Sequence, residues 1–264
     1  MAEDTSQVHE ENAAEEPVHE MSFWEHIEEL RKRIFLMAIG VVVGCLIAGV
    51  FSDQIMKYFL LLPASHTNPP IKLINLKPYG YITIYMQVIL IAGIILSLPF
   101  TLYQFWQFIA PGLYQHERKW IKWITFFTTF CFLSGLAFAF FVALPYMLNF
   151  FAGFTPSDQV QNQWSINEYL GTVVGAMLTG GIIFELPMVS FFLGKLGILT
   201  PAFMRHYRRH AIVVILIVAA IVTPTPDPVT QLLFALPLWI LYEISIFVVA
   251  MAKKKRDEKA AAQA

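Results

Sequence analysis

Six apolar runs dominate this chain and constrain its fold more than any other feature. A helix needs about 20 apolar residues to cross the hydrocarbon core of a membrane. Runs of this kind cover residues 34–51, 79–98, 124–144, 169–193, 211–222 and 231–252. Only 14% of the residues are charged, whereas a soluble domain carries about a quarter. The sequence therefore predicts an all-α integral membrane protein with six transmembrane helices.

The fifth and sixth spans are unusual, and the second span has a proline at its end. The fifth run has 12 residues, or roughly 18 Å of helix against a hydrocarbon core of about 30 Å. The sixth is interrupted by Pro237 and preceded by Pro228. Either polar groups at the helix ends are drawn inward or the bilayer is thinned beside them, and length alone leaves both readings open. In the second span, Pro99 is expected to bend the helix into an aromatic extension at the membrane surface.

The Lys and Arg residues predict how the spans are oriented. Short cytoplasmic loops of membrane proteins carry an excess of these bases. If the N-terminus is cytoplasmic, all but three of the 18 Lys and Arg residues fall on the cytoplasmic side. The exceptions are Lys57, Lys72 and Lys77, and the predicted outer loops 145–168 and 223–230 contain no base. Both termini are therefore predicted to be cytoplasmic.

The two ends of the chain differ in charge. Residues 1–29 contain many acids and no Lys or Arg, so they lack the basic start of a secretory signal peptide. We expect residues 1–25 to form a retained, mostly disordered acidic tail in the cytosol. The six-span membrane domain is expected to cover residues 26–252, and residues 253–264 form a basic cytosolic tail.

Two carboxylic acids fall within the predicted spans. Glu185 stands in "GIIFELPMV", two residues before Pro187, and Glu243 stands in "ILYEISIF". A charged carboxylate at the centre of a membrane costs at least a few kcal/mol, so it is expected to face a cavity or a partner. The alternative is a neutral acid that is hydrogen-bonded to a neighbouring helix. That alternative is weaker for Glu185, because Pro187 leaves a nearby backbone carbonyl without its usual donor.

The sequence offers no sign of catalysis or of a cofactor. It contains no P-loop, no HExxH motif and no nucleophile–base motif, and no nucleic-acid partner is predicted. Cys45 and Cys131 lie inside apolar runs, where a free thiol behaves as a small hydrophobic group. His206 and His210 are four residues apart, but two arginines lie between them. This pair is interpreted as part of a basic surface, and no metal site is predicted.

Two further acids stand among cytoplasmic bases, where they look misplaced. Glu29 lies in "EHIEELRKRIF" and Glu117 lies in "APGLYQHERKWIKW". Glu29 can pair with Arg33 four residues later, a contact that contributes a few tenths of a kcal/mol. Glu117 lies near the start of the third span, where the helix dipole favours an anion. The local pattern alone favours these structural roles.

Several longer segments resemble one family of membrane proteins. The segments "HIEELRKR", "LPFTLYQFWQFIAPGLYQHERK", "FELP" and "TPTPDPVTQLLFALPLWILYE" are similar to those of the TatC family, the multi-spanning subunit of the twin-arginine protein translocase. The resemblance runs in register from about residue 26 to residue 253. The acidic N-terminal extension and the extra prolines of "TPTPDP" depart from common members of the family.

The resemblance implies a function for the misplaced acids. Members of the family bind twin-arginine signal peptides at the cytoplasmic face, and their two recognition glutamates match Glu29 and Glu117. Two guanidinium groups need two carboxylates, each of which can accept a planar pair of donors. The resemblance also places further residues in this binding surface: Phe108, Leu113 and Arg118 around Glu117, and Arg31 beside Glu29.

Other matched positions imply a shape and a docking edge. Glu185 matches an intramembrane acid on the concave face of a cupped six-helix bundle, and short fifth and sixth helices match the family as well. Asp227 and Gln231 match polar positions at the outer end of the sixth helix, near the docking site of single-span Tat partners of the TatA and TatB type. Gln231 is expected to offer its side-chain amide to such a partner.

The sequence thus predicts a receptor and scaffold of the twin-arginine translocase in a bacterial inner membrane. The resemblance implies export of folded proteins driven by the proton-motive force, self-association in the receptor complex and contact with lipid. The alternative is a proton-coupled transporter of small solutes that uses Glu185.

Overall fold

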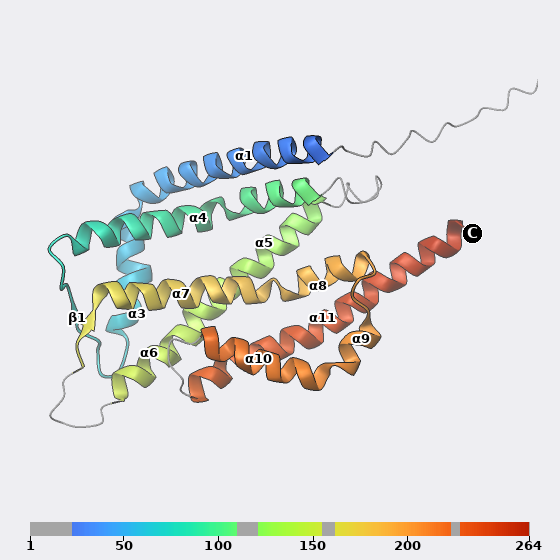
Figure 1. The fold of residues 1–264 in the computed structure, drawn as a ribbon. Helices are drawn as coiled ribbons and strands as arrows, with labels where there is room; N and C mark the ends of the chain where they lie inside the picture. The colour runs from blue at the N-terminus through green and yellow to red at the C-terminus, as the bar shows by residue number, and fades with distance from the viewer. Residues whose placement is uncertain (1–22, 110–120, 155–161, 223–227, 264) are drawn as a thin grey trace, which may run out of the picture.

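Helices form nearly all of the computed structural model, which describes residues 23–109, 121–154, 162–222 and 228–263 (Figure 1). The longer helices are α1 (Phe23–Val50), α4 (Gly80–Ile109), α5 (Ile121–Phe138), α6 (Leu144–Gly153), α7 (Ile166–Phe184), α8 (Leu186–Lys195), α10 (Arg208–Val222) and α11 (Pro228–Gln263). The short elements are α2 (Ser52–Ile55), the π-helical η1 (Met56–Leu61), α3 (Leu62–Ser65), β1 (Leu73–Ile74), the π-helical η4 (Ala139–Ala143), β2 (Trp164–Ser165) and α9 (Pro201–His206).

Five helical stretches among the described residues are long and apolar enough to cross a membrane. They are Trp24–Val50, Gly80–Ile109, Ile121–Gly153, Ile166–Lys195 and Pro228–Lys254. Each coincides with one of the predicted apolar runs, namely the first to fourth and the sixth. The prediction of an all-α, multi-pass membrane protein is therefore confirmed.

The fifth apolar run forms the short helix α10. This helix has 15 residues and is roughly 22 Å long, which is less than the hydrocarbon core of a bilayer. It begins at Arg208, three residues earlier than predicted. In Figure 1 the end of α10 and the start of α11 stop short of the end of the molecule where β1 and α3 lie.

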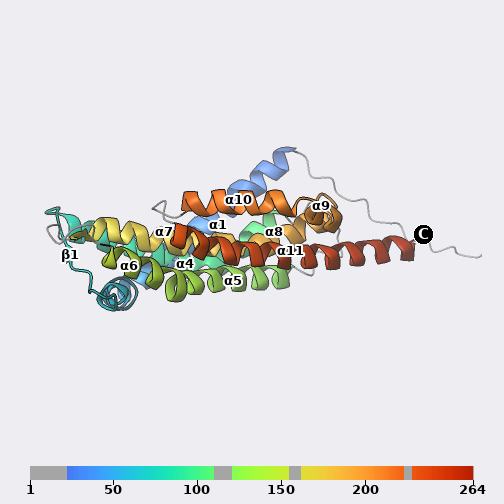
Figure 2. The same cartoon turned by 90° about the horizontal axis from the view of Figure 1, so that it is seen from below.

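The sixth helix is not short, and in this respect the prediction is wrong. α11 is one helix of 36 residues that continues through Pro237. Its basic tail is rich in Lys, Glu and Ala, which favour helix, and Lys254 lies 3.8 Å from Glu258 one turn later. The last turns of α11 therefore project beyond the other helices (Figures 1 and 2).

The segments after the first and third spans are more ordered than the sequence predicts. Residues 52–65 form α2, η1 and α3, and Met56 and Leu60 from this stretch are buried in the core. The predicted outer loop 145–168 begins with α6, and it contains β2, which pairs in parallel with β1. Pro145 is the second residue of α6 and follows directly after the π-helical η4, within the continuous helical stretch Ile121–Gly153.

Glycines set how closely the main helices pack. Gly44 of α1 lies against Gly93 of α4, and Gly135 of α5 lies against Gly180 of α7, so that a Cβ atom at any of these positions would meet the opposite helix. Small residues allow such approach where lipid gives helices no hydrophobic reason to associate. Figures 1 and 2 agree that α1 and α4 lie side by side, which fixes the positions of the side chains between them.

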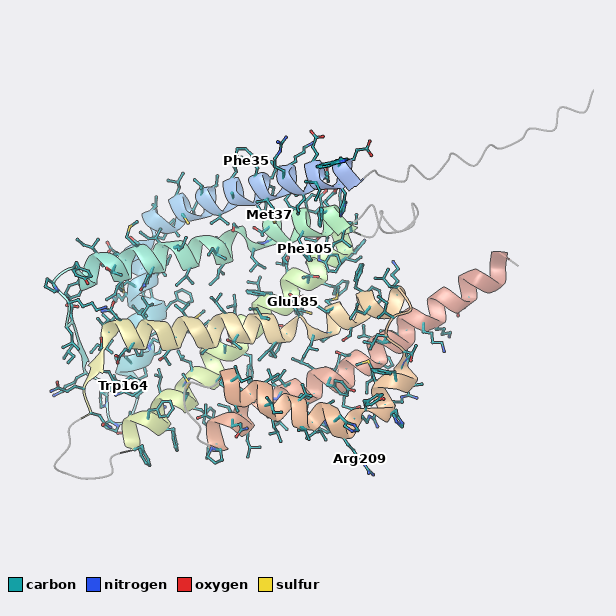
Figure 3. The ribbon with its side chains drawn as sticks, viewed as in Figure 1. Phe35, Met37, Phe105, Trp164, Glu185 and Arg209 are labelled. Atoms are coloured by element: carbon teal, nitrogen blue, oxygen red, sulfur yellow. The ribbon has the colours of Figure 1, made fainter. Side chains whose placement is uncertain are left out.

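The main core lies toward the end of the molecule that contains β1. Its most deeply buried side chains include Tyr169, Ile84 and Leu144, and the Tyr169 hydroxyl donates to the carbonyl of Leu60 at 2.7 Å. The outer faces of the helices expose large apolar side chains instead, such as Phe35, which points away from the bundle in Figure 3. This inverted pattern suits a protein whose outer surface meets lipid.

The aromatic extension after Pro99 belongs to the bundle. α4 continues through Pro99 to Ile109 as one helix. Gln104 and Trp106 from this stretch are buried, and the indole N–H of Trp106 donates to the hydroxyl of Thr128 at 3.2 Å. This part of α4 contacts α1 through Gln104 and α5 through Trp106, and its position at the membrane surface stays a prediction.

Candidate functional site

The described part of the predicted site centres on the carboxylate of Glu29 in α1. Its Oε1 accepts a hydrogen bond from Nε of Arg33 at 2.6 Å, and Nη2 of Arg33 lies 2.6 Å from the same oxygen in an ion pair. Only 21% of the Glu29 side chain and 18% of the Arg33 side chain are exposed. The local pairing that the sequence predicts is confirmed. Among the described residues, none donates a hydrogen bond to Oε2 of Glu29.

Arg33 also ties this pair to α4. Its Nη1 donates to Oε1 of Gln104 at 2.7 Å, and its Nη2 donates to Oε1 of Gln107 at 3.3 Å. Gln104 is buried, and the amide of Gln107 donates in turn to the hydroxyl of Tyr103 at 2.8 Å. A guanidinium group carries five donors in one plane, so Arg33 connects the carboxylate to two glutamines at once. We call Glu29, Arg33, Gln104 and Gln107 the Arg33 network.

An aromatic contact closes the same end of the α1–α4 interface. The rings of His26 in α1 and Phe108 in α4 stack with centroids 4.6 Å apart and planes 23° apart. His26, Glu29 and Arg33 recur at spacings of three and four, which places them on one face of α1. Phe108 is four residues after Gln104 and shares its face of α4. The structure therefore brings Phe108 to the same contact as Glu29.

Arg31 lies on another face of α1. Its side chain is 84% exposed and lies 4.0 Å from the carboxylate of Glu28, which is 76% exposed. Two residues along a helix turn the side chain by about 200°, so Arg31 points away from Glu29. Arg31 therefore makes no contact with the Glu29 carboxylate in the described structure, and its place in the signal-binding surface stays a prediction.

Four of the predicted site residues, Glu117, Leu113, Arg118 and Asp227, lie outside the described residues. Their roles stay predictions. Of the positions assigned to the signal-binding surface, the described structure brings Glu29 and Phe108 together and separates Arg31 from them.

Glu185 lies at the break between α7 and α8. Its N–H donates to the carbonyl of Ile182 at 3.1 Å, and its own carbonyl accepts from the N–H of Val189 at 2.9 Å. Pro187 follows as the second residue of α8, which explains why the helix restarts there. In Figure 3, Glu185 lies near the middle of the bundle. Its Oε1 is buried and has no hydrogen-bond partner among the described residues.

Glu243 has a partner that the sequence analysis missed. Nη2 of Arg208, at the start of α10, donates to Oε2 of Glu243 in α11 at 2.7 Å. About half of the Arg208 side chain and a third of the Glu243 side chain are exposed. The sequence places Arg208 outside the predicted fifth span, but α10 begins earlier than predicted and includes this arginine.

Gln231 also makes a contact within the chain. Its side-chain N–H donates to the carbonyl of Leu216 in α10 at 3.0 Å. One of the two N–H groups of this amide is therefore used within the chain, and the predicted role of Gln231 toward a partner stays a prediction. Together with the Arg208–Glu243 pair, this bond joins α10 to α11 at two points.

Metal-ligating side chains do not gather in the described part of the chain. No group of three His, Cys, Asp or Glu side chains there is suited to a metal ion. His206 and His210 both pack against Tyr207, with ring centroids 5.0 and 5.4 Å from it. Cys45 and Cys131 are free thiols.

The glutamines of the Arg33 network are the functional candidates that sequence reasoning missed. Arg33 and its partners Gln104 and Gln107 are 71 and 74 residues apart in the chain, so no local pattern links them. The available signal was the polar pair itself, because Gln104 and Gln107 stand in a mostly apolar helix and need hydrogen-bond partners.

Three comparisons with known proteins agree with one another. The family model described as "Sec-independent protein translocase protein (TatC)" matches residues 25–237. The TatC protein of Desulforapulum autotrophicum is 38% identical over 237 residues, which cover 89% of this chain and 86% of the relative. The TatCy protein of Bacillus subtilis is 35% identical over 245 residues, which cover 93% of this chain and 95% of the relative.

Solved structures give the same result. A crystal structure described as the twin arginine translocase receptor TatC is similar to this chain with a TM-score of 0.73 and 35% sequence identity. The match covers 86% of this chain and 99% of the solved one. A second crystal structure of the receptor, in DDM, gives a TM-score of 0.74. These matches confirm the resemblance that the sequence motifs indicate, and they make this protein a component of the twin-arginine translocase. The chain belongs to the TatC family of Sec-independent protein translocase proteins.

Proposed function

We propose that this chain receives twin-arginine signal peptides at the cytoplasmic face of a bacterial inner membrane. The observation that carries the proposal is the carboxylate of Glu29, which is mostly buried and leaves Oε2 without a donor among the described residues. A fixed carboxylate with one open oxygen is an acceptor for a cationic donor. The similarity to a crystal structure described as a twin arginine translocase receptor supports this role.

The distribution of bases supports the proposed orientation. The start of α1, the end of α8, α9 and the end of α11 lie at one end of the molecule (Figure 1). These segments contain most of the Lys and Arg residues in the described part of the chain. Cytoplasmic ends of membrane proteins carry such an excess, so this end and both termini are cytoplasmic in our proposal.

The second carboxylate of the proposed receptor is Glu117. It follows Phe108 in the chain by nine residues, and Phe108 stacks on His26 one helical turn before Glu29. Leu113 and Arg118 complete the proposed surface around Glu117. Arg31 acts only at long range in this proposal, because its side chain points away from Glu29.

The edge formed by α10 and α11 is the proposed docking site for single-span Tat subunits. One N–H of the Gln231 amide is bonded to Leu216, and its Oε1 accepts no hydrogen bond from any described residue. That oxygen, with Asp227, is the polar group available to a partner helix. Self-association in the receptor complex belongs to the same proposal, and Glu185 acts in the later, transport step. The translocase relatives give no support to a small-solute transporter.

Two variants of α1 test the receptor role. Glu29→Gln keeps the shape of the side chain and an acceptor for Arg33 but removes the negative charge. A charge-assisted hydrogen bond contributes about 1.5–3 kcal/mol, so the dissociation constant of a twin-arginine signal peptide should rise about 10- to 100-fold. The matched control is Glu28→Gln, the exposed neighbouring acid.

Binding is measured by fluorescence anisotropy of a labelled signal peptide with the purified protein in nanodiscs. A peptide with both arginines replaced by glutamine shows the non-specific level. If Glu29→Gln binds the twin-arginine peptide as tightly as Glu28→Gln does, Glu29 has only its structural role and the receptor proposal for this acid fails.

A further inference from the structure

The Arg33 network has a feature that the receptor role alone does not explain. The guanidinium group of Arg33 already occupies the carboxylate that is proposed to receive an arginine of the cargo. Both Nε and Nη2 point to the same oxygen, Oε1 of Glu29, at 2.6 Å. The other oxygen, Oε2, accepts no hydrogen bond from the described residues. One oxygen of the Glu29 carboxylate is thus bonded within the chain, and the other is open.

The glutamines make this occupation stable. Gln104 holds Nη1 at 2.7 Å, and Gln107 contacts Nη2 at 3.3 Å. Gln104 itself is only 5% exposed, so it has little freedom to release the guanidinium. An arginine with so little exposed surface needs its partners, because an unpaired charge is costly to bury. Arg33 therefore keeps Oε1 of Glu29 when a second cation approaches.

We propose that Arg33 is a specificity-determining residue, which holds Oε1 of Glu29 so that the signal peptide is received by Oε2 alone. The inference rests on the proposed receptor function. It has a chemical consequence that the receptor function does not imply. A carboxylate with two open oxygens accepts two parallel N–H bonds from arginine, and lysine cannot reproduce this geometry. A single open oxygen accepts one N–H from either side chain.

Glu29 therefore recognises a positive charge and does not require the two parallel N–H donors of a guanidinium group. At the signal position that meets Glu29, lysine should replace arginine with less than about a threefold loss of affinity. A site that takes a bidentate arginine would lose one charge-assisted hydrogen bond, or about tenfold or more. The difference between these two losses is what the experiment measures.

The first step identifies the signal arginine that meets Glu29. Synthetic signal peptides with glutamine at either arginine are bound to the wild-type protein and to Glu29→Gln in nanodiscs. Only the arginine that contacts Glu29 loses its effect on affinity in the Glu29→Gln protein. If neither arginine is coupled to Glu29, the receptor role of this acid fails, and the specificity inference fails with it.

The second step measures the lysine penalty at the coupled position. In the wild-type protein we expect a penalty below about threefold, and in Arg33→Met we expect it to rise to about tenfold, because both oxygens are then open. Arg33→Lys keeps a cation that occupies Oε1 and should restore the small penalty. Arg31→Met, which removes an exposed arginine two residues away, is the charge-matched control.

The outcomes separate the two proposals. Coupling to Glu29 with a penalty of tenfold or more in the wild-type protein preserves the receptor role and overturns the inference about Arg33. A small penalty that stays unchanged in folded Arg33→Met overturns it as well. If Arg33→Met does not fold, the wild-type penalty alone decides. One further outcome is that Arg33→Met and Arg31→Met each change the affinity for arginine and lysine peptides by the same factor. If that factor is equal in the two variants, it is a long-range charge effect and also counts against the inference.

Discussion

The ion pair between Arg208 and Glu243 predicts a measurable coupling between α10 and α11. α10 is too short to span a bilayer alone, and its attachment to α11 includes this pair and the bond from Gln231 to the carbonyl of Leu216. The charged atoms are 2.7 Å apart, which favours a strong interaction, but 48% of the Arg208 side chain and 32% of the Glu243 side chain are exposed. Exposed pairs of this kind contribute on the order of 1 kcal/mol after screening.

We expect Glu243→Gln and Arg208→Gln each to lower the free energy of unfolding by about 1 kcal/mol. The double variant should cost little more than either single change, which gives a coupling energy of the same size. For a protein of this length, 1 kcal/mol corresponds to roughly 2–4 °C in Tm. Tm is measured in detergent by tryptophan fluorescence, at low salt and at high salt, where the coupling should shrink.

Arg209→Gln is the matched control, because Arg209 follows Arg208 and points away from the bundle in Figure 3. The reversed pair, Arg208→Glu with Glu243→Arg, should recover part of the lost stability. A neutral Glu243 would tolerate glutamine, which preserves a hydrogen-bond acceptor. If Glu243→Gln leaves Tm unchanged and the two single changes are additive, the reasoning from the ion pair is refuted.

Three further predictions concern the rest of the bundle. Glu185→Gln should slow the proton-driven export of a folded precursor into inverted membrane vesicles while signal-peptide binding persists; a wild-type export rate would leave this acid a structural role only. Gln231→Leu removes the bond to Leu216 and should shift disulfide crosslinks between cysteines placed along α10 and a single-span Tat subunit; an unchanged crosslinking pattern argues for docking elsewhere. Gly44→Leu should cost about 1–3 kcal/mol, because its side chain meets Gly93, whereas Gly49→Leu points into open space and should leave Tm nearly unchanged.

Hydrophobic length predicts most of the fold. The first to fourth and the sixth apolar runs form helices long enough to cross a membrane, and the fifth run forms the short helix α10. The errors arose at the ends of helices. Residues 145–153 begin with a proline and residues 253–263 are mostly polar, so both look like the end of a span in the sequence, yet they form part of α6 and the end of α11. A helix that is already nucleated extends at little cost through residues of good helix propensity.

Local spacing predicts contacts within a helix but not between helices. The contact of Glu29 with Arg33 follows from their separation by four residues, and it is confirmed. The contact of Arg208 with Glu243 joins residues 35 apart. Whether two helices bring such groups together depends on their rotation about their own axes. Close glycine packing, as between Gly44 and Gly93, sets that rotation, and one sequence alone does not show which glycines face each other.

The Arg33 network shows why a structural role for Glu29 and its proposed role in signal binding are compatible. An exposed pair four residues apart contributes only a few tenths of a kcal/mol, but this pair is mostly buried and joins α1 to α4 through Gln104. Glu29→Ala therefore removes the proposed cargo acceptor and also leaves the buried charge of Arg33 without its carboxylate, which costs stability. Glu29→Gln leaves an acceptor for Arg33, so it should lower signal binding with a smaller loss of Tm than Glu29→Ala. If both variants lose stability and binding in equal proportion, the lost binding reports a loosened α1–α4 contact instead of a lost acceptor.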